Sequence, residues 1–366
     1  AAQAAGQKGN FSEAIKQLKE AKAIGNLKAD EEYAVNELLI WAANSAGDYK
    51  LLAATIEERL ATGRVTGGDK VQKLNVLANA YYSSGDLRKS IDATERLIAA
   101  RGTGAGDDLT LLGTAQFQLK DYRSASATLE RAYSAAERAG KSAKTRGQLL
   151  EMLNRSYFEM GDTARRMQTL GRLMSVAPST AVFEQVATAV SKEAAGDPVI
   201  LLSVYRLGAR KNVLSKGHYA KYADAALDQS SPGEAVLALE KGMANGGVKK
   251  DDRAERLLAD AKKQIEQVRI NLPQQEKEAR ALSNGEGDMR LATSFYTLKD
   301  YAKAVEAAKR GLGKGRVKRP DAANMLLGIA LVESKKGAEA KAAFQAAGAA
   351  NPSIKSVADL WAAVGA

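Results

Sequence analysis

The sequence contains no cysteine and only one histidine, His218. Without cysteine the chain cannot form a disulfide, a thiolate zinc site, an iron–sulfur centre or a cysteine nucleophile. One histidine also excludes every metal centre built from several imidazoles. No Ser or Asp motif accompanies His218, so an exposed or capping side chain at the start of a helix is the simpler interpretation. We therefore expect no enzyme activity, no cofactor and no metal.

Aromatic residues and proline are also scarce, at 5% of the chain and 6 of its 366 residues. A chain of this length usually holds two or three domains, but so few aromatic residues argue against a thick central core. Helix-forming residues dominate. A hydrophobic content of 45% and a mean hydropathy of −0.31 exclude a disordered chain and a multi-span membrane protein.

One short turn recurs along the chain: a small or polar residue, then in most copies Asp or Asn, and often an aromatic residue. Gly47-Asp48-Tyr49 and Lys120-Asp121-Tyr122 are examples. The turns begin at residues 9, 47, 85, 120, 161, 196, 230, 271, 299 and 335, and the one at Asn271-Leu272-Pro273 is irregular. Turns at intervals of roughly 36 residues indicate a repeat protein.

Helical periodicity flanks the turns, as in Leu74, Leu77, Ala78 and Tyr81 at positions i, i+3, i+4 and i+7. Asp or Asn in the turn can cap the second helix, and Gly permits the tight reversal. Each unit is therefore a helical hairpin. Since one hairpin cannot bury its apolar face alone, neighbouring hairpins must stack.

The last repeat resembles the tetratricopeptide repeat most closely. The matching residues are Leu327-Gly328, Leu331, Ala340, Phe344, Ala347 and Pro352. The resemblance implies an all-α, right-handed α-solenoid of about ten helical hairpins. Leu360 and Trp361 follow Pro352 at helical spacing, so we expect a C-terminal capping helix in which Trp361 is a packing residue.

Three segments are expected. Residues 1–180 hold about five regular hairpins, residues 181–285 hold divergent repeats, and residues 286–366 hold the C-terminal repeats and the capping helix. Within the middle segment, residues 251–285 are expected to combine a long first helix with a short second one.

The resemblance implies that the first helices of successive hairpins line a concave, partner-binding groove. Its predicted residues are Trp41, Asn44, Asn75, Asn79, Tyr82, Thr114, Phe117, Gln118, Arg155 and Phe158. Thr110, Gln148 and Glu151 are expected on the same face, and Met289, Thr293, Tyr296, Met325 and Ile329 in the same positions near the C-terminus. Amides beside aromatic rings suit a polypeptide. The carboxylate clamp of chaperone-binding members is not predicted, because Asn75, Gln148 and Glu151 stand where it needs Lys and Arg.

Charge gives a second candidate site. Lys and Arg outnumber Asp and Glu by 54 to 43, for a net charge of +11, and the excess gathers in residues 241–320. Six cations there form a run without an acidic residue: Lys309, Arg310, Lys314, Arg316, Lys318 and Arg319. In a Gly-rich loop between the last two repeats, they are expected either to bind an anionic polymer or lipid headgroup or simply to keep the surface soluble.

The leading hypothesis is a non-enzymatic scaffold or adaptor that binds a protein or peptide partner in its groove, in bacterial envelope assembly. The alternative is an adaptor for an anionic polymer or membrane surface that uses residues 241–320. The first residues, Ala1–Ala5, are typical of a mature end after signal-peptide removal or of an end cut from a longer chain. We expect a periplasmic protein, although zero cysteine fits the cytoplasm as well. The capping helix favours a monomer, with an oligomer through the end helices left open.

Overall fold

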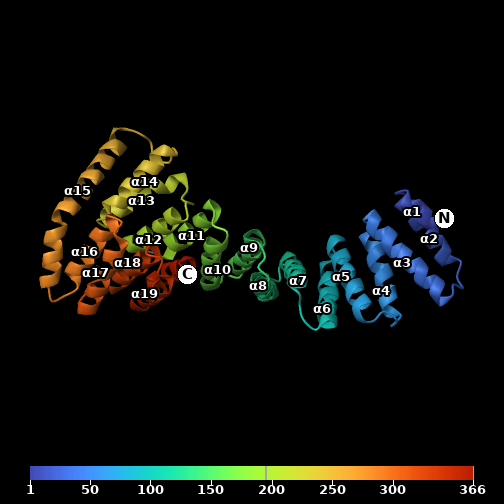
Figure 1. The fold of residues 1–366 in the computed structure, drawn as a ribbon. Coiled ribbons are helices and arrows are strands. Elements are labelled where there is room, and N and C mark those ends of the chain that lie inside the picture. Colours follow the sequence, from blue (N-terminus) through green and yellow to red (C-terminus); the bar gives the residue numbers. More distant parts are fainter. Residues whose placement is uncertain (194–195, 366) are drawn as a thin grey trace. The chain divides into compact units, whose positions relative to one another are not determined.

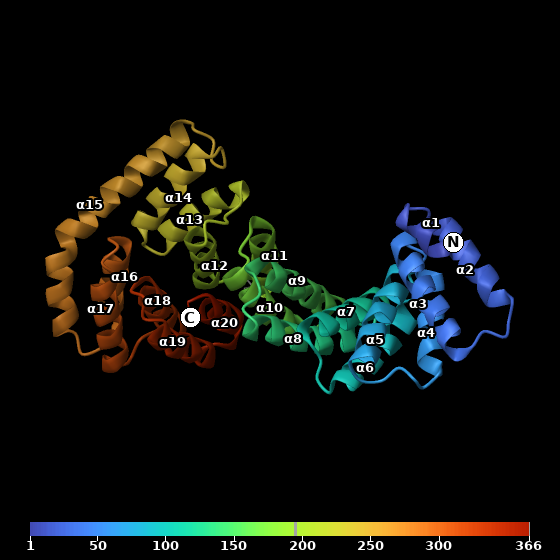
Figure 2. The same cartoon turned by 45° about the vertical axis from the view of Figure 1, so that its right-hand side comes forward.

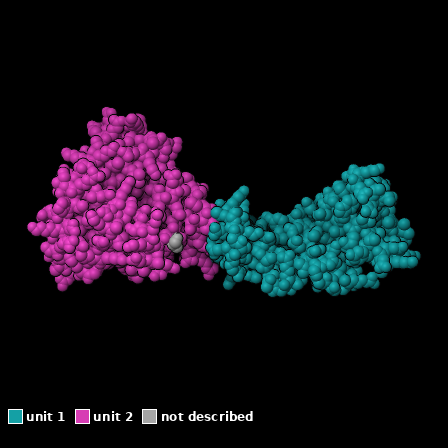
Figure 3. Space-filling view, in the orientation of Figure 1, with its two compact units in different colours: residues 1–162 teal, residues 163–366 magenta. Residues whose placement is uncertain are grey.

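The computed structural model describes residues 1–193 and 196–365. In this part of the chain there are twenty α-helices, two short 3-10 helices and no strand (Figure 1). The chain divides into two compact units, residues 1–162 and residues 163–366 (Figure 3). The all-α stack of hairpins expected from the sequence is therefore confirmed. The handedness of the solenoid and the three-segment division stay predictions.

Unit 1, residues 1–162, contains nine helices in its described residues. They are α1 (Ala2–Gln7), α2 (Phe11–Ala23), α3 (Ala29–Ala46), α4 (Tyr49–Ala61), α5 (Gly67–Ser83), α6 (Leu87–Arg101), α7 (Gly106–Gln118), α8 (Tyr122–Arg138) and α9 (Ala143–Glu159). Each packs against the next along the chain. Small and branched apolar residues fill the seam between them, among them Leu74, Leu77 and Ala78. This continuous seam replaces the thick core that the composition argued against.

Unit 2 contains the remaining helices. They are α10 (Thr163–Val176), α11 (Thr180–Glu193), α12 (Pro198–Arg210), α13 (Tyr219–Asp228), α14 (Pro232–Ala244), α15 (Asp252–Ala281), α16 (Glu286–Thr297), α17 (Tyr301–Lys314), α18 (Pro320–Glu333), α19 (Gly337–Ala350) and α20 (Lys355–Val364), with 3-10 turns η1 (Lys216–His218) and η2 (Pro352–Ile354). In the last repeat, the Gly and Phe positions of the pattern mark a close approach between α18 and α19. A Cβ atom at Gly328 on α18 would lie 2.4 Å from the Phe344 ring on α19, so only glycine fits.

Nine of the ten predicted turns lie where the sequence places them, and they share one geometry. In the turns at Gly47 and Gly85 the glycine has a positive φ, and the next residue caps the second helix: the Asp48 carboxylate accepts a hydrogen bond from the Leu51 N–H at 3.0 Å. Lys120 and Lys299 adopt the same left-handed backbone at φ values of 63° and 62°. The reversal is therefore preserved where lysine replaces glycine, and Asp121 and Asp300 keep the cap there, whereas the turns at Ser230 and Lys335 have no side-chain cap.

The turn predicted at Asn271-Leu272-Pro273 is wrong. Residues 252–281 form the single 30-residue helix α15, and Pro273 lies inside it. Figure 2 shows α15 bending along its length. Proline cannot donate the backbone hydrogen bond of a helix interior, but contacts at both ends hold this helix, with α14 and α16 as the neighbours. The two helices expected within residues 251–285 are therefore one.

Unit 2 closes on itself. The last helix, α20, packs against α10, the first helix of the unit, and also reaches α12. The Trp361 side chain is fully buried, stacks on Phe344, and donates its indole N–H to the Ser203 carbonyl at 2.9 Å. Trp361 is thus a packing residue, as predicted. Its helix covers the first helices of the unit as well as α19.

Candidate partner-binding surface

In unit 1, the first helices of successive hairpins meet along one face. The Glu37 carboxylate on α3 pairs with the Lys73 ammonium on α5 at 2.6 Å. The Gln118 amide on α7 donates to the Tyr82 hydroxyl on α5 at 2.6 Å. The hydroxyl of Thr114 on α7 lies 4.0 Å from the Met152 sulfur on α9. The two residues in each pair are 36 or 38 positions apart, so equivalent positions of neighbouring repeats touch across this face.

A hollow of about 500 Å³ lies on this face between α7 and α9. We call it the α7–α9 hollow. Its lining residues come only from these two helices: Thr110, Phe117, Thr145, Gln148, Leu149, Glu151, Met152 and Arg155. Five of the residues that the sequence places on the groove face, Phe117 and Arg155 among them, therefore lie around one depression.

The hollow combines an apolar floor with polar groups. Phe117 is half-buried and packs edge-on against Tyr122, with ring centroids 5.6 Å apart. Met152 supplies a flexible, polarisable side chain beside it. At the rim, Arg155 has only a loose contact with Glu159, 3.8 Å between Nε and the carboxylate, and its side chain is 69% exposed. The hollow can thus bury an apolar side chain and offer a charged donor next to it.

Other predicted groove residues lie outside the hollow. Trp41 on α3 packs edge-on against Phe11 with centroids 5.6 Å apart, and it keeps 38% of its surface exposed. Asn44 and Asn75 are exposed. The Asn79 amide donates to the Asn75 carbonyl at 2.8 Å, so part of its hydrogen-bonding capacity is used within α5. Phe158 is 59% exposed on the last turn of α9.

Three residues of the hollow were missed from the sequence: Thr145, Leu149 and Met152. Helical spacing could have found Met152, since it lies four residues after Gln148 and three before Arg155 on one helix face. The prediction emphasised amides and aromatic rings, and so it passed over the aliphatic and thioether side chains between them.

The predicted groove does not continue unchanged into unit 2. Met289 and Thr293, predicted on the groove face, line a cavity there. Tyr296, Met325 and Ile329 were predicted on the open face, but they are buried. The reason is packing within unit 2, where the Arg206 guanidinium on α12 lies over the Tyr296 ring, 4.7 Å from its centroid. Every residue of α18 from Met325 to Val332 is buried, and a Cβ atom at Gly365 after α20 would lie 2.4 Å from Val332.

The cationic run is not a single loop. Lys309, Arg310 and Lys314 lie on α17, and only the later cations belong to the connection with α18. Lys309 pairs with Glu339 at 2.5 Å. Arg310 and Lys314 both reach the buried Asp288 carboxylate, at 2.6 and 2.9 Å.

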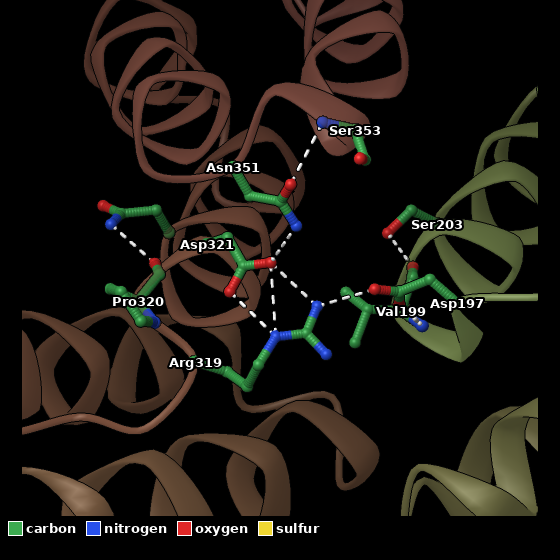
Figure 4. Close-up of polar contacts among 9 residues, drawn as sticks. Asp197, Val199, Ser203, Arg319, Pro320, Asp321, Asn351 and Ser353 are labelled. Carbon is green, nitrogen blue, oxygen red and sulfur yellow. Dashed lines mark hydrogen bonds and ion pairs between the residues drawn. The ribbon is translucent and has the colours of Figure 1, made fainter. Parts of the chain in front are cut away.

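The end of the run joins two parts of unit 2. Arg319 pairs with Asp321 and with Asp197 before α12, each at 2.8 Å, and the Asn351 amide donates to Asp321 (Figure 4). Four of the six cations are therefore engaged by carboxylates of this chain, and Arg316 and Lys318 are the remaining two. The prediction of a freely accessible cationic loop is therefore wrong.

His218 stands at the N-cap position of α13, but its side chain makes no capping hydrogen bond and is not exposed; it is a packing residue. Its ring lies edge-on to Phe183 and tilted against Tyr205, and Nδ1 is 2.6 Å from the Ser215 hydroxyl. Burial is the main cause that lowers the pKa of its imidazole, and the nearby Glu184 carboxylate opposes that shift. Within the described ranges no group of three or more His, Cys, Asp or Glu side chains could hold a metal ion. None of the described helices is long and apolar enough to span a membrane.

No protein-family model and no curated protein matches the chain. Among solved structures, the TPR2AB domain of yeast Sti1 in its pHSP90 complex is 12% identical over 81% of this chain and 99% of that one, with a TM-score of 0.29. Naa15/Naa10 bound to HypK-THB is 16% identical over 95% of this chain and 52% of that one, at 0.43. A tetratricopeptide repeat protein from Parabacteroides merdae is 14% identical over 80% and 99%, at 0.27. At these values the assignment of the fold rests on the hairpins themselves.

Proposed function

We propose that this chain is a non-enzymatic scaffold that binds a partner polypeptide on the first-helix face of unit 1, with the α7–α9 hollow as its anchor site. The observation that carries the proposal is the hollow itself. It places the apolar side chains of Phe117 and Met152 beside the exposed guanidinium of Arg155, on a face built from repeat-equivalent positions. An interface anchor needs this combination of a desolvated pocket and a neighbouring charged donor.

The chemistry of the hollow favours a partner with a bulky apolar residue next to an acidic one. Phe117 and Met152 would bury the apolar side chain, and Arg155 would pair with the carboxylate. The Gln118 and Tyr82 side chains, already hydrogen-bonded to each other, continue the polar surface towards α5. An extended segment could therefore cross from α9 to α5.

A phage-displayed library of random peptides tests this proposal whatever the identity of the partner. The full chain should enrich peptides that combine a large apolar and an acidic residue. Phe117→Ser with Met152→Ser should weaken the best peptide at least tenfold, because a hot-spot pocket is worth about 2 kcal/mol or more. The matched control is Phe11→Ser with Met160→Ser, which alters the same residue types outside the hollow. Failure to enrich such peptides, or an equal loss of peptide affinity in the test and control variants, would contradict the proposal.

The anionic-polymer alternative is less well supported, since four of the six cations are already paired within the chain. The salt dependence of binding distinguishes the peptide-binding proposal from the anionic-polymer alternative. Groove binding should change little between about 50 and 200 mM salt, whereas binding through neutralised phosphates should fall steeply.

The finer assignment, a periplasmic partner in bacterial envelope assembly, rests on the resemblance of the repeats alone. Fractionation of the cells that produce the chain, followed by immunodetection, checks it. Recovery with the cytoplasmic fraction would remove the envelope role and leave the peptide-binding proposal standing.

A further inference from the structure

Unit 2 holds an open cavity that the proposed function does not use. Its volume is about 580 Å³, within the range of small-molecule sites, roughly 300–1,000 Å³. Its walls come from α12, the end of α13, α15, α16 and the start of α18. These helices are far apart in sequence, and they surround one space in unit 2.

Part of the lining is apolar and part is polar but already satisfied. Leu202, Met289 and Leu326 supply apolar surface. Arg206 also reaches the cavity, but its guanidinium donates to both oxygens of the Glu234 carboxylate, at 2.6 to 3.1 Å, and is buried with it. Arg206 therefore leaves no uncompensated charge for a ligand.

Charged side chains without a partner stand at two ends of the cavity. Arg290, Lys318 and Asp228 all line the cavity, and each is exposed to solvent. Among the described residues, no hydrogen bond or ion pair reaches the charged groups of these three side chains. Beside the two cations, Arg319 uses Nε and Nη2 for its carboxylate partners, and among the described residues no hydrogen bond reaches its Nη1.

Helix α16 gives the separation of the two ends. The Lys318 backbone N–H donates to the Glu286 carboxylate, at the first turn of α16. The Gly233 N–H, just after the turn that follows Asp228, donates to the Thr297 hydroxyl at 2.8 Å, at the last turn of α16. From Arg290 to Thr297 the helix rises about 10 Å, and from Glu286, beside the Lys318 backbone, about 16 Å, at about 1.5 Å per residue.

The local charge balance decides between ligand classes. Near the cationic end stand the carboxylates of Glu286, Asp197 and Asp321, so that end is close to neutral as a whole. A polyanion gains little there. A ligand with one negative and one positive group, separated by an apolar body, would meet an unpaired partner at each end and apolar surface between them.

We propose that the cavity of unit 2 binds a small zwitterion with an apolar middle, of the size of a free peptide of two or three residues. Its carboxylate would lie at Arg290, Lys318 and the open Nη1 of Arg319, and its ammonium at Asp228. An extended peptide spans about 3.3–3.6 Å per residue, so two or three residues plus the reach of the side chains cover the separation of about 10–16 Å. The Gln229 and Gln275 amides lie along this path.

Isothermal titration calorimetry of the full chain with alanyl-leucyl-alanine tests the proposal. The free tripeptide should bind, and its N-acetylated and C-amidated forms should each bind at least tenfold more weakly, because each lacks one of the two charges. Absence of binding heat at millimolar concentrations of the free tripeptide would overturn the site. Equal binding of all three forms would overturn the assignment of both ends.

Charge-neutral variants assign the two ends. Arg290→Gln with Lys318→Gln should weaken the free tripeptide at least tenfold and abolish its advantage over the amide. Asp228→Asn should abolish the advantage over the acetylated form. The matched controls are Arg316→Gln and Asp224→Asn, neighbours that do not line the cavity, and both should bind as the unaltered chain does. Unchanged affinity in the Asp228→Asn variant would overturn the assignment.

Discussion

At the start of α18, Arg319 and Asp321 form an ion pair that joins distant parts of unit 2. The Asp321 carboxylate accepts from Arg319 Nε and Nη2 and from the Asn351 amide (Figure 4). Arg319 extends the network to Asp197, 122 residues earlier in the chain. Hydrogen bonds to charged groups are the stronger ones, and the Asp321 side chain is almost fully buried. This pair therefore fixes the start of α18 against α12.

Replacing Asp321 should show how much the ion pair contributes to the stability of unit 2 and how that contribution depends on pH. Asp321→Asn should lower the free energy of unfolding of unit 2 by about 1.5–3 kcal/mol at pH 7. The bonds from Arg319 and Asn351 hold the pKa of the Asp321 carboxyl well below its usual range. Its stabilisation is thus present above the unfolded pKa of about 3.9 and is lost as the pH falls through the folded-state pKa. Urea unfolding at pH 7 and near pH 2 measures the difference.

The control is Asp224→Asn, an exposed carboxylate on α13, which should change stability by less than about 0.5 kcal/mol. If Asp321→Asn lowers the free energy of unfolding by the same amount near pH 2 as at pH 7, the carboxylate charge is not what stabilises the start of α18.

Individual helices were largely predictable because each carries local signals. The Asp48 cap and the periodic apolar residues around Leu74 define a helix without reference to the rest of the chain. The α15 region was not predictable in this way. Pro273 is a helix-breaking signal when read locally, whereas tertiary contacts hold both halves of the helix: Lys262 pairs with Glu240 on α14, and the Gln275 amide oxygen accepts from Ser294 on α16.

Pro273 should therefore cost stability. Pro273→Ala should raise the free energy of unfolding of unit 2 by about 1–3 kcal/mol, since alanine restores a helix-interior N–H and proline is about 3 kcal/mol less favourable there. The urea midpoint of the full chain measures it. Pro320→Ala is the matched control. Pro320 lies in the first turn of α18, where proline is well tolerated, so its replacement should bring no gain. If the Pro273→Ala variant were less stable, that result would favour the turn predicted from the sequence over the continuous helix.

At the scale of the whole molecule, the sequence predicts the repeat and misses what closes unit 2. Stacking follows from the periodic spacing of the turns, and the groove face of α7 and α9 follows from helix rotation. The packing of α20 onto α10 and α12 joins residues as distant as Ser203 and Trp361, and such a contact leaves no periodic trace. The unit-2 cavity likewise joins distant helices. The sequence places Met289 and Thr293 of its lining on a groove face and Lys318 and Arg319 in the cationic run, and it does not bring the two sets together.

Trp361 is the residue on which the closure can be tested. Trp361→Ala should destabilise unit 2 by about 3–5 kcal/mol, the usual cost of truncating a buried aromatic residue. Hydrogen exchange followed by mass spectrometry should show lost protection in α10, α12 and α20, with α3 to α6 of unit 1 unchanged. Trp41→Ala, at the half-exposed tryptophan of unit 1, should show the reverse pattern with a smaller loss. Loss of protection confined to α20 in the Trp361 variant would contradict the closure.

The most direct test of the account uses the methyl groups of the 7 methionines in the full chain. Met152 lies in the α7–α9 hollow and Met289 in the unit-2 cavity, so one methyl-labelled NMR spectrum reports on both sites. A library-selected peptide should shift the Met152 signal and leave Met289 unchanged. A saturating peptide that leaves the Met152 signal in place would contradict the central claim, that a partner polypeptide binds the first-helix face of unit 1.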